Sequence, residues 1–167
     1  MKNRIFVSFL ISCLLVGCSS SLGLVQLNNI FIKENRPLSD WAKDLLRVRT
    51  KAFEKLNVNL DNADEIYLIE TYNLEGLYYD GLLYLDENQY YHFYRKGIGA
   101  EVDVLNQELT ETEKYIIEEL KNYEYDRLKE KSIKSNLITP ISLYVTVVNN
   151  RAKKRIEFFM LRSFYVD

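Results

Sequence analysis

Residues 76–97, GLYYDGLLYLDENQYYHFYRKG, carry the pattern that decides the fold. Two apolar and aromatic runs, 82–85 and 89–95, lie on either side of Asp86-Glu87-Asn88, which predicts two strands joined by a tight turn. The pair Asp80-Gly81, just before the first run, is typical of a further turn or a bulge. This stretch therefore predicts an antiparallel hairpin at the centre of the chain.

A strand and a helix are predicted on the N-terminal side of this hairpin. Residues 65–72, EIYLIETY, are rich in β-branched and aromatic side chains, which favours a third strand next to the hairpin. Before it, Ser39 is a typical N-cap, and the negative charge of Asp40 suits the first turn of a helix. We expect a helix over 39–56 that packs on the sheet through apolar residues at helical spacing, namely Trp41, Leu45, Val48, Ala52 and Leu56.

The second half of the chain predicts one more helix and two more strands. Thr110 and Glu113 have the spacing of a capping box, in which two side chains satisfy backbone N–H groups at the helix end. Apolar residues at helical spacing extend this helix to about Lys131. Residues 141–148 and 155–166 then favour two long strands, with a turn between them near position 150.

The order of these elements indicates the fold class. A helix, three strands, a second helix and two strands follow one another, and neighbouring strands are joined too tightly for crossover helices. The sheet should therefore be mostly antiparallel. We expect a single α+β domain over residues 37–167, with about five strands and two main helices packed on one face of the sheet.

Length and charge limit the classes of protein to which the chain can belong. It has 167 residues, enough for one domain with a real core. Removal of the N-terminal leader described below lowers the Lys and Arg count from 22 to 20, against 24 Asp and Glu, for a net charge of −4. Such mild acidity argues against a nucleic-acid partner, which would favour a basic face.

The first sixteen residues have the pattern of a secretory signal. Lys2 and Arg4 supply a positive start, and an apolar run broken only by Ser8 and Ser12 follows over residues 5–16. This run is shorter than the roughly 20 apolar residues that a membrane-spanning helix needs. We therefore expect an export signal rather than a membrane span.

The end of this run is the residue pattern Leu15-Val16-Gly17-Cys18. It resembles the lipobox of bacterial lipoproteins, in which an apolar residue and two small or modest residues precede a cysteine. In that family a diacylglycerol is attached to the cysteine sulfur, the signal is cut before the cysteine, and the new amine is acylated. The resemblance implies that Cys18 is lipidated and that the Gly17–Cys18 bond is the cleavage site, so that residues 1–17 are removed.

The resemblance also implies a location. Acyl chains on Cys18 would insert into the lipid bilayer, which is therefore an expected partner. They would anchor the protein to the membrane, and the protein would not span it. In the family an aspartate after the cysteine is associated with inner-membrane retention, so Ser19 favours the outer membrane, facing the periplasm. In a host without an outer membrane the plasma membrane takes its place. We expect residues 18–36 to form the lipidated N-terminus and a tether, with a short extended segment around Leu24 to Ile32.

No catalytic residue, metal site or cofactor is predicted. His92, the lone histidine, would suit a general base, but no activated nucleophile, second histidine or free cysteine accompanies it in the mature chain. The acidic segments 61–64 and 86–88 lack the spacing and glycine of a calcium loop, and we interpret both as turns. Walker and Rossmann glycine patterns are absent from the sequence. A glycosidase-like pair of carboxylates stays open, because its geometry cannot be read from spacing.

The thirteen tyrosines are the most unusual feature of the composition. Tyrosine suits recognition surfaces, but it is also favoured in ordinary strands, so both interpretations stay open. Strand alternation separates Tyr90, His92 and Tyr94 from Tyr91, Phe93 and Arg95. Phe93 is the better core residue. We therefore predict that the first set is exposed and binds a protein partner.

Three functions are compatible with these observations. The first is a membrane-anchored envelope lipoprotein that acts as a non-catalytic protein-binding or accessory module, either as an assembly component or as an inhibitor of the immunity type. The alternative is a small envelope enzyme that acts on cell-wall sugar or peptide. The third is a structural tether with no tight partner. A deep pocket with paired carboxylates would favour the enzyme.

Overall fold

The computed structural model describes residues 22–56, 58, 60, 63–72, 78–97, 99–134, 142–149 and 155–162. Within these residues the chain forms four helices, α2 (Leu22–Glu34), α3 (Asp40–Leu56), α4 (Glu111–Lys121) and α5 (Tyr125–Lys134). It also forms six strands, β1 (Glu65–Tyr72), β2 (Tyr78–Asp86), β3 (Gln89–Lys96), β4 (Asp103–Leu105), β5 (Ser142–Asn149) and β6 (Arg155–Arg162).

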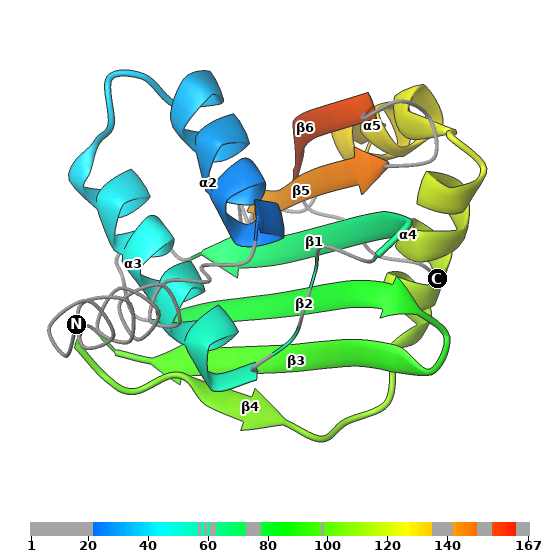
Figure 1. The fold of residues 1–167 in the computed structure, drawn as a ribbon. Helices are drawn as coiled ribbons and strands as arrows, with labels where there is room; N and C mark the ends of the chain where they lie inside the picture. The colour runs from blue at the N-terminus through cyan, green and yellow to red at the C-terminus, as the bar shows by residue number, and fades with distance from the viewer. Residues whose placement is uncertain are drawn as a thin grey trace, which may run out of the picture.

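The strands form one antiparallel sheet in the order β4-β3-β2-β1-β5-β6 (Figure 1). The predicted α+β class and the antiparallel sheet are confirmed. β1 is the strand between the central hairpin and the closing pair β5–β6, so the two halves of the chain meet along it. The three-residue edge strand β4 was not predicted, since it is too short for alternation to be visible.

The central hairpin forms as predicted, with one difference. β2 and β3 meet through the turn after Asp86, where the Asn88 N–H donates to the Asp86 carboxylate at 2.8 Å. The predicted turn or bulge at Asp80-Gly81 is wrong, because both residues are paired within β2. Gly81 serves a packing role instead, since a Cβ there would lie 2.2 Å from Cε2 of Phe93.

Both predicted helices begin where expected, but the second one ends earlier than predicted. α3 covers the predicted range to within one residue, and Thr110 and Glu113 form the capping box that opens α4. The expected continuous helix to Lys131 is wrong. It is divided into α4 and α5 at Asn122–Glu124, where Tyr123 has a φ of 61°, a left-handed conformation that a helix cannot contain.

α2 occupies most of the segment that was predicted to be a tether. The expected extended segment around Leu24 to Ile32 is wrong, because these residues are helical. Leu27 and Phe31, four positions apart, are fully buried against α3 and the sheet. The globular domain predicted to begin at residue 37 therefore includes α2.

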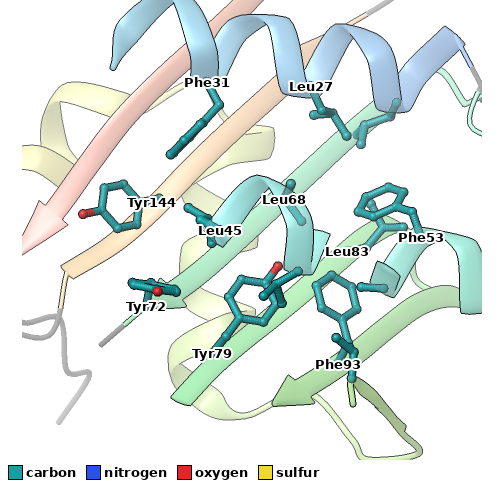
Figure 2. Packing of buried hydrophobic residues seen from close by; sticks show 14 of the residues in the cluster. Leu27, Phe31, Leu45, Phe53, Leu68, Tyr72, Tyr79, Leu83, Phe93 and Tyr144 are labelled. Carbon is teal, nitrogen blue, oxygen red and sulfur yellow. The ribbon is translucent and has the colours of Figure 1, made fainter. Parts of the chain in front are cut away.

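The first layer of helices, α2 and α3, covers one face of the sheet. Its core holds alternate residues of β1 (Ile66, Leu68 and Tyr72) together with Leu27 and Phe31 of α2 and Leu45, Val48 and Ala52 of α3. Figure 2 shows Leu27, Phe31 and Leu45 of the helices on the side of the sheet that also carries Tyr79, Leu83 and Phe93. Trp41 is partly buried at the margin of this core and stacks on Tyr144, with ring centroids 5.5 Å apart.

The second layer, α4 and α5, covers the opposite face (Figure 1). The other residues of β1, Tyr67 and Ile69, join Ile116, Ile117, Leu120 and Leu128 in a separate core. The prediction of two helices packed on one face is therefore wrong. β1 has apolar side chains at both odd and even positions, which is typical of a strand that is buried on both sides.

A fully buried ion pair joins α3 to the sheet in the first layer. Arg49 and Glu70 are both 0 % exposed, and the guanidinium donates to both carboxylate oxygens, with Nε 2.9 Å from Oε1. Arg49 Nη1 also donates to the Leu27 carbonyl of α2 at 3.2 Å, and the Tyr79 hydroxyl donates to Glu70 at 2.8 Å. Burial opposes the charge on Arg49, but the Glu70 carboxylate outweighs it and raises the pKa of Arg49.

A second charged group lies at the edge of the same layer. The Asp44 carboxylate accepts hydrogen bonds from the Tyr72 hydroxyl and from Arg95 Nη2, both at 2.8 Å, and from Arg47. Burial alone would raise the pKa of Asp44, but these hydrogen bonds lower it to about 2. Asp44 therefore stays ionised and ties α3 to β1 and β3.

Replacement of Arg49 by Met tests the buried ion pair. The change leaves the Glu70 carboxylate buried without a counter-charge, so we expect a loss of about 3–5 kcal/mol in unfolding free energy. Urea unfolding of the chain from residue 19 onward measures it. The control is Lys43→Met on the same helix, which removes an exposed pair with Asp40 and should cost about 0–1 kcal/mol. Equal costs for the two variants would contradict this interpretation.

Candidate functional site

The predicted lipidation site lies outside the residues that the structure describes. Gly17 and Cys18 precede Leu22, the first described residue, by five and four positions. Their roles in signal cleavage and lipidation therefore stay predictions. In the part of the chain that is described, no helix has the length and apolar character needed to cross a bilayer.

The predicted partner-binding set is not an exposed face. His92 is 1 % exposed, and Tyr90 and Tyr94 are only partly exposed, because α4 packs over this side of β3. The predicted exposure is therefore wrong for His92. The assignment of Phe93 to the core is confirmed, since it is 0 % exposed in the first layer. Partner binding by the first set stays an untested prediction, now without the exposure on which it was based.

His92 is part of the packing between β3 and the start of α4. Its Nε2 lies 3.1 Å from Oε1 of Glu113, whose other oxygen accepts from the backbone N–H and the hydroxyl of Thr110 at 2.7 and 2.8 Å. Burial raises the pKa of Glu113, but hydrogen bonds from His92 and Thr110 outweigh it and lower the pKa. At 1 % exposure the His92 ring has almost no access to solvent, which favours a packing role.

The clustered tyrosines mostly serve as packing groups. Tyr79 and Tyr84 are buried, and Tyr90 stacks on Tyr84 with ring centroids 6.4 Å apart. Tyr78, Tyr91 and Tyr94 are partly buried. All six of these tyrosines are at least half-buried, so ordinary sheet packing accounts for them better than a recognition surface does.

A cavity of about 530 Å³ opens at one end of the sheet. It lies where β1 begins, where β2 turns into β3 and where α4 ends. The antiparallel register of β1 and β2 pairs Tyr67 with Tyr84, and this register brings Asp64, just before β1, and Glu65, its first residue, beside the turn after β2. The cavity is lined by Ala63, Asp64, Glu65, Tyr67, Leu85, Asp86, Glu87, Asn88, Gln89 and Lys121.

Glu65 is the best-held carboxylate in this cavity. Its oxygens accept hydrogen bonds from the Tyr67 hydroxyl, from Asn149 Nδ2 at 2.7 Å and from the Tyr123 hydroxyl at 3.3 Å. Asn149 Nδ2 also donates to the Tyr123 hydroxyl at 2.8 Å, so the donors support one another. Burial raises the pKa of Tyr67 well above its usual value, and the hydrogen bond to the Glu65 carboxylate raises it further. The Tyr67 hydroxyl therefore keeps its proton and donates to Glu65.

The charges of the cavity are mostly negative. It has four carboxylates, from Asp64, Glu65, Asp86 and Glu87, and one cation, Lys121, for a formal charge of −3. Lys121 Nζ lies 3.7 Å from Glu87 and 5.1 Å from the centre of the Tyr84 ring. A concave site of this charge favours a cationic group such as an arginine or lysine side chain.

The sequence predicts turns at both acidic segments, 61–64 and 86–88, and does not predict that they form one site. The signal that could have joined them is that they lie just outside two strands predicted to be antiparallel neighbours. Among the described residues, no group of three or more His, Cys, Asp or Glu side chains has the arrangement of a metal site.

Comparison with known proteins adds no relative: no protein-family model, no curated protein and no solved structure matches this chain.

Replacement of Glu113 by Ala tests whether the His92 group is structural. The change removes the capping box and leaves His92 buried without its partner, so we expect a loss of about 1–3 kcal/mol in unfolding free energy. Glu111→Ala, in the same helical turn but 82 % exposed, is the control and should change stability by no more than about 0.5 kcal/mol. Urea unfolding compares the two variants, and equal losses would refute the structural role.

Proposed function

We propose that this protein is a lipid-anchored lipoprotein of the bacterial envelope that acts as a non-catalytic binding module. The observation that carries the anchoring is the order of a positive start, an apolar run and the residues Leu15-Val16-Gly17-Cys18. In this proposal acylated Cys18 anchors the protein in the lipid bilayer of the outer membrane, and the domain faces the periplasm. In a host without an outer membrane, the anchor lies in the plasma membrane. Two or more acyl chains on one residue give stable anchoring.

The binding role is supported by how the domain uses its polar side chains. The lone histidine is packed under α4, and the six tyrosines of β2 and β3 are at least half-buried. The acidic cavity is a concave, charged feature that is open to solvent. We propose that it receives a cationic side chain of an envelope protein, which the module helps to assemble or inhibits. The net negative charge of the mature chain argues against a nucleic-acid partner.

A second candidate function is a small enzyme that acts on cell-wall sugar or peptide. The observation that favours it is the presence of several carboxylates around one cavity, since glycoside hydrolysis uses two. Against it, three donors aimed at the Glu65 oxygens suit a carboxylate held in one place rather than a group that gives up a proton. Release of soluble fragments from cell walls by the chain, lost in Glu65→Gln, would favour the enzyme.

Replacement of Cys18 by Ser tests the anchoring. Because the thiol is the acceptor of the lipid, we expect the variant to remain an uncut precursor without incorporated acyl label. Metabolic labelling with a radioactive fatty acid, followed by electrophoresis, measures both effects. The control is Cys13→Ser, which changes the cysteine inside the leader and should be processed and labelled like the wild type. Equal labelling of Cys18→Ser and the wild type would end the lipoprotein proposal.

Neutralisation of the cavity tests the binding role. The double variant Asp64→Asn/Glu87→Gln removes two negative charges while leaving the hydrogen bonds of Glu65 intact. We expect co-purification of the partner from membranes of the native host to fall by roughly fivefold, the equivalent of about 1 kcal/mol. Quantitative mass spectrometry measures the retained proteins.

The matched control for the cavity variant is Glu101→Gln/Glu111→Gln, which removes the same charge from side chains that are 85 % and 82 % exposed and lie outside the cavity. It should retain the partner like the wild type. If the two double variants retain the same proteins to the same extent, the cavity is not the binding site.

A further inference from the structure

The distance between the proposed anchor and the folded domain is short. Only residues 19–21 separate Cys18 from Leu22, the first residue of α2. Four Cα–Cα steps of about 3.8 Å cannot span more than about 15 Å. If Cys18 holds its acyl chains in the bilayer, the start of α2 lies within that distance of the headgroups.

α2 cannot lengthen this connection, because it is part of the folded core. Leu27 and Phe31 are 0 % exposed, and the Leu27 carbonyl accepts from buried Arg49 at 3.2 Å. The Arg49 guanidinium also lies 5.0 Å from the centre of the Phe31 ring. Separation of α2 from the body would expose these apolar side chains and remove an acceptor from a buried cation. The rest of the domain must therefore lie close to the membrane together with the start of α2.

The surface beside the anchor has the chemistry of a bilayer contact. Residues 19–32 contain no charged side chain. The first charged residue after Cys18 is Lys33, about three helical turns after the start of α2. Val25, in the first turn, is 41 % exposed. An apolar side chain there meets water in the isolated domain, but would meet the headgroup and acyl boundary in the anchored protein.

We infer that the first turn of α2 lies against the bilayer that holds the acyl chains of Cys18, with Val25 in the interfacial region. The inference rests on the proposed lipid anchoring. It makes the start of α2, which packs over β5 and β6, the membrane-proximal part of the domain, whereas β4 lies at the opposite edge of the sheet (Figure 1). The acidic cavity, which is lined by Lys121 of α4 and Tyr67 of the second core, then stays open to a partner.

Depth measurement by fluorescence quenching tests the inference. In the proposed mature protein Cys13 is removed and Cys18 is acylated, so a single introduced cysteine is the only free thiol. Val25→Cys, labelled with an environment-sensitive fluorophore, is made in the acylated full-length protein. It is then reconstituted into phosphatidylcholine–phosphatidylglycerol vesicles that carry nitroxide-labelled lipid.

The matched control is Val104→Cys, which replaces the same residue type at nearly the same exposure, 44 %, on the edge strand β4. β4 is separated from β5, which α2 contacts, by three strands, or about 19 Å at a strand spacing of 4.8 Å. We expect at least about threefold more quenching at position 25 than at position 104, since interfacial helices bury their apolar side about 5–10 Å deep. Asn29→Cys, one turn further along α2 and also exposed, should be quenched more than position 104 and serves if labelling at position 25 unfolds the protein.

The outcomes separate this inference from the proposed function. Vesicle flotation reports anchoring independently of the fluorophore. If the acylated protein does not float with the vesicles, the lipoprotein proposal fails, and the inference fails with it. If the protein floats but positions 25 and 29 are quenched no more than position 104, the anchoring stands and the membrane contact of α2 is refuted.

Discussion

The buried pairing of Arg49 with Glu70 is the constraint on which the arrangement of the first layer depends. Through it α3 is tied to β1, while the same guanidinium holds a carbonyl of α2 and the Tyr79 hydroxyl of β2 holds the carboxylate. Arg49 and Glu70 are fully buried, so water cannot replace a lost partner. A shift of α3 relative to β1 would therefore leave a buried charge unpaired. A buried pair adds little net stability compared with apolar packing, and we infer that its role is to specify one position of the helices on the sheet.

Coverage of both sheet faces explains why residue types that usually indicate a site are used here for packing. A sheet with helices on one side would have left His92 and its neighbouring tyrosines facing solvent. With α4 laid over that side, His92 becomes the partner of a capping-box glutamate, and Tyr84 and Tyr90 stack in the second core. The proposed binding site lies instead at the end of the sheet, where α4 ends and where the start of β1 and the turn after β2 bring carboxylates together.

The proposed anchor and the proposed binding site are compatible with each other in space. α2 belongs to the first layer and starts four residues after Cys18, whereas the cavity is lined by residues of the second core and of α4. A domain that rests on the bilayer through the start of α2 would leave the acidic cavity open to the compartment beyond. The short connection would also limit partners to those near the membrane surface, because the domain cannot extend far from it.

The sequence alone determined the features that depend on neighbouring residues. Strand β1, the hairpin turn after Asp86, the capping box of Thr110 and Glu113 and the helix from residue 40 are local patterns, and each formed as predicted. Tertiary structure decided the rest. The apolar residues from Leu24 to Ile32 fit a strand as well as a helix, and only packing of Leu27 and Phe31 against α3 selects the helix. The exposed face and the cavity depend on which segments distant in sequence become neighbours. Glu65 and Asp86 meet because β1 and β2 pair in one register, and that register is set by the burial of both strands between two helix layers, which no local pattern encodes.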